Sequence, residues 1–404
     1  MTTKVTKLKN NIEFAYKRNP DTPRVAFYLN FSLNNPSSQA GVYSLMVRLF
    51  MQGTKKRTAQ QLSEELDKYA IEFSAELKLD YVKFKFVCLN EDFERAMDIF
   101  EDIVKNTTFE EFEKERTKLE GEIIAELDSP RAKIIDSYYK NIYEGHNYGF
   151  TNTVILENLK NISKEDVKNA YKEIVDNSKK VVAFVGDLDF DKVNNVLNEK
   201  FGDLIQSVDE LPVLRKPELV KSKEVDVIQA DLNQAHILKG WLVGSADSSD
   251  YPAIALLNII LGASGLSSRL FLELRDKKGL AYVVRSAYDV ARLSANFSIY
   301  IATEPKNIET SLKGFEEEIE KIKTVLVSEE ELENAKNNIF GKWAFISETN
   351  SQQANWLAHY GIMGFGFDFH KNAVEKIKSV TPQDIMDCAN KYFNDKYVLT
   401  VLKP

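Results

Sequence analysis

The chain carries the same helix-to-strand passage twice, once in each half. The first copy is LKNISKEDVKNAYKEIVDNSKKVVAFV, and the second, near the C-terminus, is IKSVTPQDIMDCANKYFNDKYVLTVL. Ser163 matches Thr381 and Asp166 matches Asp384, and each pair is 218 residues apart (381 − 163 and 384 − 166). In each copy, a Ser or Thr that can cap a helix precedes a helical segment and an apolar strand. This repeat predicts two halves of similar design.

A polar segment separates these halves. Residues 211–222 contain Pro212 and Pro217 among charged side chains, which is typical of a linker. A chain of 404 residues with 44% apolar residues is long enough for two domains, each with its own core. We expect an N-terminal domain over 1–210 and a C-terminal domain over 223–404. The expected fold class is α+β, with two homologous α/β-sandwich halves that enclose a central cleft.

Local patterns predict the first elements of the chain. Alternating apolar residues in IEFAY and RVAFYLNFSL predict a β-hairpin whose turn lies at 19–23. The segment from Gly41 to Gln52 has apolar residues at the spacing of one buried helical face, and Gly53 ends it.

The stretch 262–288, GASGLSSRLFLELRDKKGLAYVVRSAY, predicts a helix followed by a strand. We expect Gly279 to end the helix, so that Arg275 and Tyr282 lie on either side of one tight turn. A guanidinium and a phenol are both donors that can stabilise a developing oxyanion. The alternative is structural: Arg275 complements the helix C-terminus and Tyr282 is a half-buried strand residue. The serines that can cap the helix start are Ser264, Ser267 and Ser268.

Composition excludes several classes of protein. The net charge of −8 and the absence of a basic block argue against nucleic-acid binding. Cys88 and Cys388 have no disulfide or metal spacing, which fits a reducing compartment. The N-terminus lacks an apolar signal segment, and the apolar stretch 253–266 is too short to span a bilayer. We therefore expect a cytoplasmic protein without a membrane partner.

The order of these elements resembles the insulinase or pitrilysin-type zinc peptidases, in the shorter branch that includes mitochondrial processing peptidase. The resemblance extends over nearly the whole chain. As a set, the matching pieces are specific: AGVYSLMVRLFMQGT, KERTKLEGEIIAELDSP, HNYG, VGDLDFDKV with FGDL, and SSRLFLELRDKKGLAY.

The resemblance places an inverted zinc motif, H-x-x-E-H, on the helix that begins at Gly41. In this chain Ser44 replaces the first His, Val47 the catalytic Glu and Arg48 the second His. Glu122 matches the family's third zinc ligand, and Glu115 matches a supporting carboxylate. A lone Glu cannot hold zinc, so we expect no metal and no cofactor in this chain. Our hypothesis is that Arg48 pairs with Glu122 in the vacated cation site, the alternative being a solvated Glu122.

The resemblance also implies a role for the C-terminal half. Arg275 and Tyr282 match, in type and spacing, an Arg and a Tyr that bind substrate and polarise the scissile carbonyl. Their retention beside a lost zinc motif resembles the family's heterodimers, in which one subunit brings zinc and the other brings Arg and Tyr. The expected function is a non-catalytic subunit that binds extended peptide and acts in trans on a homologous, zinc-bearing partner.

Two other interpretations stay open. The chain could be purely structural or peptide-binding, with no role in proteolysis, as family members embedded in respiratory complexes are. It could also be an autonomous peptidase with an unusual metal site, which we disfavour because zinc catalysis needs three protein ligands and an open position. A homodimer in the absence of a partner is a further alternative.

Overall fold

The computed structural model describes residues 3–204, 207–345 and 347–404. The chain divides into two units, each built around one β-sheet. Unit 1 comprises Met1–Glu122, Ile155–Leu214 and Phe345–Phe369, and unit 2 comprises Ile123–Val154, Arg215–Ala344 and His370–Pro404. Each unit therefore combines segments from both halves of the sequence.

The sheet of unit 1 has the strand order β1-β2-β6-β3-β5-β4. The central strand β6 pairs in parallel with β2 and antiparallel with β3. The predicted hairpin between β2 and β3 is therefore wrong: both strands form, but β6 lies between them. The strands are β1 (Lys4–Lys7), β2 (Glu13–Arg18), β3 (Arg24–Ser32), β4 (Glu72–Leu77), β5 (Tyr81–Leu89) and β6 (Lys180–Gly186).

The sheet of unit 2 repeats this topology in the order β7-β11-β8-β10-β9. Its central strand β11 pairs in parallel with β7 and antiparallel with β8, as β6 does with β2 and β3. The predicted duplication is thus confirmed at the level of strand order and direction. The strands are β7 (Lys223–Ile228), β8 (Ala235–Val243), β9 (Ala281–Val290), β10 (Ala295–Thr303) and β11 (Val398–Lys403).

Matching helix caps precede the two central strands. The Ser163 backbone N–H donates to Asp166 over 2.8 Å, and the Thr381 N–H donates to Asp384 over the same distance. In both caps the hydroxyl of the first residue also accepts from the backbone N–H of the fourth, which completes a capping box. The same local chemistry therefore starts α7 (Lys164–Asn177) before β6 and α14 (Pro382–Tyr392) before β11.

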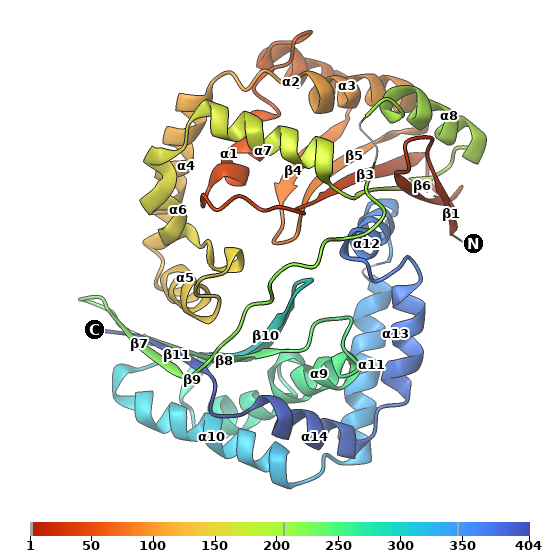
Figure 1. Cartoon of the computed structure of the whole chain (residues 1–404). Helices are drawn as coiled ribbons and strands as arrows, with labels where there is room; N and C mark the ends of the chain where they lie inside the picture. The colour runs from red at the N-terminus through yellow and green to blue at the C-terminus, as the bar shows by residue number, and fades with distance from the viewer. Residues whose placement is uncertain (1–2, 205–206, 346) are drawn as a thin grey trace. The chain divides into compact units, whose positions relative to one another are not determined.

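Helices cover both sheets (Figure 1). Apart from α7 and α14, unit 1 holds α1 (Val42–Leu49), α2 (Ala59–Lys68), α3 (Phe93–Asn106), most of α4 (Phe112–Leu127), α6 (Asn152–Asn158) in part, α8 (Phe190–Phe201) and α12 (Asn350–Met363). Unit 2 holds α5 (Pro130–Ile142), α9 (Tyr251–Asn258), α10 (Ile308–Thr324), α11 (Glu329–Phe345) up to Ala344, and α13 (Phe369–Lys378) from His370.

Two helices pack on the sheet of the other sequence half. Helix α12 packs on β3 and β6, where Ala354 and Ala358 meet Ala183 of the sheet. Helix α5 packs on β8 and β11, and a side chain at Gly240 would collide with Tyr138 of α5. The packing units therefore differ from the sequence domains 1–210 and 223–404, because each half gives one helix to the other sheet.

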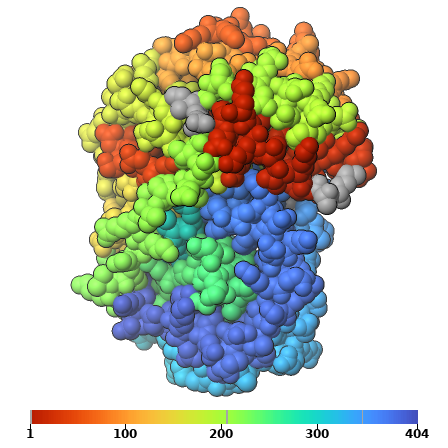
Figure 2. All heavy atoms as spheres, turned by 45° about the vertical axis from the view of Figure 1, so that its right-hand side comes forward, coloured from red at the N-terminus to blue at the C-terminus, as the bar shows by residue number. Residues whose placement is uncertain are grey.

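The connection between β1 and β2 bonds to α8. The backbone N–H of Lys9 donates to Asn198 over 2.8 Å, and the Asn10 side chain donates to the Phe201 carbonyl over 2.8 Å. In Figure 2 the red N-terminal residues border the green residues of this region. Across the described ranges, no helix combines the length and the apolar character that a bilayer crossing requires.

Candidate functional site

Helix α1 begins at a position that favours glycine. Gly41 has φ +96°, and a Cβ there would lie 3.0 Å from Ile155 and 3.1 Å from Ile162. A side chain at this position would thus combine backbone strain with crowding against two neighbours. The glycine therefore allows α1 to begin in close contact with Ile155 and Ile162.

One face of α1 is buried and the other is partly exposed. The buried residues are Val42, Tyr43, Leu45, Met46 and Leu49. Ser44, Val47 and Arg48 are each partly exposed, and their spacing of i, i+3 and i+4 places them on one helical face. The three residues that replace the zinc motif therefore share one accessible surface.

Arg48 joins this face to helix α4. Its Nη1 and Nη2 donate to the two carboxylate oxygens of Glu122, each over 2.9 Å, and its Nε donates to Glu115 over 3.1 Å. The predicted contact between Arg48 and Glu122 is confirmed. Sequence reasoning did not assign Arg48 the second bond, although Glu115 lies one heptad before Glu122 and hence on the same side of α4.

The ion pair keeps Arg48 protonated and Glu122 ionised. Burial lowers the pKa of Arg48, but its hydrogen bonds and charge interactions with Glu122 and Glu115 outweigh this effect and raise it above the ordinary value. The hydrogen bond from Arg48 is the largest cause that lowers the pKa of Glu122. A guanidinium of this kind cannot take or give a proton near neutral pH. These residues therefore form an ion-pair cluster and not an acid–base pair.

The residues present do not suit a zinc ion. At this face the chain offers a hydroxyl, an isopropyl group and a guanidinium in place of His, Glu and His. Within residues 3–204, 207–345 and 347–404, no three His, Cys, Asp or Glu side chains are grouped so that they could hold a metal. The cationic group that Glu122 contacts is the side chain of Arg48.

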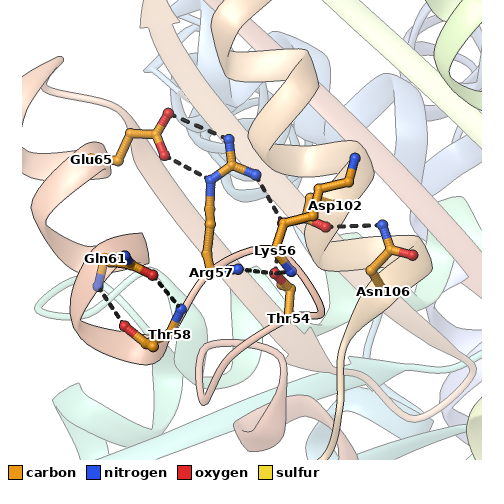
Figure 3. A network of polar contacts seen from close by, with 8 residues as sticks. All are labelled: Thr54, Lys56, Arg57, Thr58, Gln61, Glu65, Asp102 and Asn106. Carbon is orange, nitrogen blue, oxygen red and sulfur yellow. Dashed lines mark hydrogen bonds and ion pairs between the residues drawn. The ribbon is translucent and has the colours of Figure 1, made fainter.

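A buried polar network fixes the loop that follows α1 (Figure 3). Asp102 on α3 is fully buried and accepts from Thr54 over 2.6 Å, Arg57 over 2.8 Å and Asn106 over 2.9 Å. Arg57 also contacts Glu65 of α2, with Nε 2.7 Å from the carboxylate. The network thereby ties the loop after α1 to both α2 and α3, and so limits the positions that the α1 face can adopt.

Arg275 and Tyr282 lie together in unit 2. Arg275 lies in η5 (Phe271–Lys277), a π-helical segment, and Tyr282 is the second residue of β9. Gly279, with φ +61°, turns the chain between them as expected. The guanidinium carbon of Arg275 lies 4.6 Å from the Tyr282 ring centroid and 4.7 Å from that of Phe271. The guanidinium is therefore within cation–π distance of two aromatic rings.

The tyrosine of this group is accessible. Tyr282 is 75% exposed at the start of β9, which is the last strand in the sheet order of unit 2. The half-buried-strand alternative for Tyr282 is therefore wrong in its burial. Sequence reasoning missed Phe271 as a third member, although its spacing of four from Arg275 indicated one helical face.

The expected serine caps are also wrong. No side chain caps the start of η5, where Leu270 is the preceding residue. Instead, Ser268 donates to the Gly265 carbonyl over 2.8 Å, and Ser267 donates to Ser264 over 3.3 Å. The serines thus bond within their own loop.

Two family models match the chain. The model described as insulinase (peptidase family M16) matches residues 14–151, and the model described as peptidase M16 inactive domain matches residues 161–339. The first range contains Ser44, Val47, Arg48 and Glu122, and the second contains Arg275 and Tyr282.

Relatives of similar length occur in bacteria. An uncharacterized zinc protease of Rickettsia felis is 26% identical, covering 99% of this chain and 97% of its own. An uncharacterized zinc protease of Bacillus subtilis is 24% identical, covering 98% and 97%. Among solved structures, a protease from Helicobacter pylori matches with a TM-score of 0.91 at 20% identity, covering 100% of both chains. A peptidase M16 inactive domain from Pseudomonas fluorescens matches with a TM-score of 0.89 at 18% identity, covering 100% and 98%. These two structures share the fold.

Proposed function

Because the chain belongs to the insulinase family of peptidases, peptidase family M16, we propose that it is the non-catalytic subunit of a heterodimeric zinc endopeptidase. It binds peptide in an extended conformation and supplies Arg275 and Tyr282 to the active site of a homologous partner, which carries the zinc. The two unpaired cysteines support a cytoplasmic location.

The observation that carries this proposal is the contrast between the two family sites. At the first, Arg48 forms three hydrogen bonds with carboxylates in the place of the metal motif. At the second, Tyr282 is largely exposed beside Arg275. The first site thus offers a paired guanidinium where the family has a metal ligand, while the second has accessible donors.

Arg275 and Tyr282 suit the binding of a carbonyl oxygen that gains negative charge. The phenol O–H and the guanidinium N–H groups are donors, and the described part of the chain shows no acceptor bonded to either side chain. The Arg275 guanidinium lies against the Tyr282 ring, so the two donor groups are close together.

The test is reconstitution with a homologue that carries H-x-x-E-H, found by co-purification or as a neighbouring reading frame. Tyr282→Phe in this chain should lower kcat of the reconstituted pair about 10²-fold, the usual effect of one lost oxyanion donor. Tyr397→Phe, which removes a phenol that bonds Glu224 elsewhere in unit 2, is the matched control and should leave kcat unchanged.

The competing function is a purely structural or peptide-binding homologue. Co-purification with an unrelated complex, or a homodimer alone, favours that function over the subunit proposal. Equal kcat for Tyr282→Phe and the native chain in an active pair would contradict the role assigned to Tyr282.

A further inference from the structure

Helix α5 packs on β8 and β11 in unit 2, and its tyrosine side chains reach β10 and β9 beside them. Tyr139 of α5 donates to Asp289 of β9 over 2.7 Å. Arg131 lies eight residues before Tyr139 on the helix, a rise of about 12 Å. Arg285 lies four residues before Asp289 on the strand, a rise of about 13 Å. Helix and strand run in the same direction from this contact, because the Tyr148 hydroxyl, past the C-terminal end of α5, accepts from the Leu293 N–H, past the C-terminal end of β9. The two arginines therefore lie toward the same end of these elements.

A second observation places both arginines beside one tyrosine. Arg285 pairs with Tyr300 across β9 and β10, and its guanidinium carbon lies 5.8 Å from the Tyr300 ring centroid. Burial raises the pKa of Tyr300, whereas the positive charges of Arg131 and Arg285 lower it. Arg131, which lies toward this end of α5, therefore acts on the same phenol from the helix.

The phenol of Tyr300 is held by a histidine. Tyr300 is 6% exposed and His236 is 9% exposed, and the Tyr300 hydroxyl lies 2.7 Å from His236 Nδ1. When Nδ1 carries the imidazole proton, it donates to the phenol oxygen, and the phenol O–H is free to donate to a third group. Helix α5, β9 and β10 therefore supply two guanidinium groups and one oriented hydroxyl to this region.

Arg131 and Arg285 have no carboxylate partner at ion-pair distance among the described residues, although the whole chain has a net charge of −8. Arg131 also lies in the first turn of α5, where the helix dipole adds positive potential. Both side chains are exposed, so a ligand can reach them.

A surface pocket lies along the same side of α5. Its volume is about 580 Å³, and Arg131, Ile135 and Tyr139 line it. Two carboxylates also line it, and each accepts from the chain: Glu126 from Asn152 over 3.0 Å and Asp136 from the Thr153 N–H over 2.9 Å. Arg131 is the basic residue that lines this pocket, and it lies in the first turn of α5.

We propose that Arg131, Arg285 and Tyr300 form a carboxylate-binding site at the N-terminal end of α5. Its ligand is a peptide carboxylate, either an acidic side chain or a C-terminal carboxyl group. The two guanidinium groups form charge-assisted hydrogen bonds with the carboxylate, and Tyr300 donates a third. The peptide part of this assignment rests on the proposed function, whereas carboxylate binding itself does not.

The first experiment uses small probes and the full chain. The chain has four histidines, so the ring signals of His236 can be assigned with His236→Gln and followed by NMR. The probes are N-acetylglutamate α-amide, which has a side-chain carboxylate, N-acetylglutamine, which has a terminal carboxylate, and the neutral N-acetylglutamine α-amide. We expect a saturable shift of the His236 signals with at least one carboxylate probe and none with the neutral probe.

Charge-neutral variants test whether the arginines bind the probe. Arg131→Gln combined with Arg285→Gln should weaken probe binding at least 10-fold, as expected when charge-assisted bonds are lost. Arg215→Gln, which removes one exposed arginine elsewhere in unit 2, is the matched control and should bind as the native chain does. An equal response to charged and neutral probes, or unchanged binding by the double variant, overturns the proposal.

Extended peptides then separate this site from the proposed function. Peptides with Glu, with Gln, and with a free or amidated C-terminus are compared by fluorescence polarisation. Peptide binding without any preference for a carboxylate contradicts this site and leaves the proposed function intact. Carboxylate probes that bind when no peptide does would support the site and contradict the peptide-binding function.

Discussion

The Tyr81 hydroxyl lies 3.0 Å from Nδ1 of His359. This bond joins β5 to α12, the helix that the second half of the sequence contributes to the sheet of unit 1. The His359 ring also packs against Trp356 and Tyr360 of its own helix. Burial lowers the pKa of His359 to about 4, and the charges of Lys83 and Lys78 add to this effect. The folded chain therefore holds this histidine in its neutral form.

We predict that acid weakens unit 1 through His359. The unfolded histidine has a pKa near 6.5, so the unfolded chain binds a proton that the folded chain excludes until about pH 4. The stabilising effect is complete above about pH 6.5 and is lost as the pH falls toward 4. Between pH 7.5 and pH 5.0 this one group should lower the free energy of unfolding by about 2 kcal/mol.

Urea unfolding at both pH values measures this effect. Carboxylates also titrate in this range, so His359→Gln serves as the reference: its loss of stability between pH 7.5 and pH 5.0 should be about 2 kcal/mol smaller than that of the native chain. Equal losses for the two proteins would show that His359 does not contribute.

The Arg48 cluster predicts an asymmetric response to mutation. Arg48→Ala leaves Glu115, which is 3% exposed, without its cationic partner, and should lower the free energy of unfolding by about 2 to 4 kcal/mol. Glu122 has a half-exposed side chain, so Glu122→Gln should cost no more than about 1 kcal/mol. Urea unfolding at pH 7 compares the two variants. Similar losses would contradict the view that Glu115 carries most of the cost.

The network around Asp102 gives a third prediction. Asp102→Ala removes the acceptor of three side chains and leaves the partly buried Arg57 with Glu65 as its ion-pair partner. We expect a loss of about 3 kcal/mol in the free energy of unfolding, measured by urea titration. Asn106→Ala removes one of these bonds and should cost about 1 kcal/mol. A loss for Asp102→Ala no larger than that for Asn106→Ala would contradict the prediction.

The sequence predicted the duplication because its signal is local. Ser163 and Thr381 each bond a residue three positions later, so a short pattern contains the whole cap. Strand pairing is not local in this way. The residues of β2 and β3 specify extended structure, but β6 comes some 150 residues later, and nothing in residues 12–32 encodes its place. One signal was available: the continuous apolar run VAFYL favours a central strand, and in the structure eight of the nine residues of β3 are buried.

The packing of α5 and α12 on the sheet of the other sequence half was not predicted. Amphipathic spacing shows that a helical face is buried, but not which sheet covers it. In α12 the small residues Ala354, Ala358 and Gly361 recur on one side, which indicates a close approach to another element. A methyl group at Gly361 would meet Phe367 and Val181, so the helix lies very near β6. The identity of the partner sheet depends on contacts far along the chain.

The candidate site was predictable to different extents. The pairing of Arg48 with Glu122 followed from the resemblance together with the rule that buried charges find partners. The proximity of Arg275 and Tyr282 was predicted, but the contact of Arg275 with Phe271 was missed, because hydrogen-bonding chemistry was considered and ring geometry was not. The roles of Arg275 and Tyr282 in catalysis stay a prediction.

The geometry of α1 also predicts that a metal site can be rebuilt. Ser44 and Arg48 are one helical turn apart on the accessible face, which is the spacing of two histidine ligands in H-x-x-E-H. The Arg48 guanidinium already reaches both carboxylate oxygens of Glu122. Positions 44 and 48 thus share one face of α1, and the side chain at position 48 contacts Glu122, which is the third ligand position.

We therefore expect the variant Ser44→His, Val47→Glu, Arg48→His to retain about one zinc ion per chain after dialysis, measured by elemental analysis, while the native chain retains none. The two histidines and Glu122 supply three protein ligands and leave one position for water. Adding Glu122→Gln removes the third ligand and should weaken zinc binding at least about 10-fold. The matched variant with only Val47→Glu has no imidazole ligand and should not bind zinc. If the triple variant folds, as judged by circular dichroism, yet holds no zinc, then Glu122 does not lie where the family's third ligand must be.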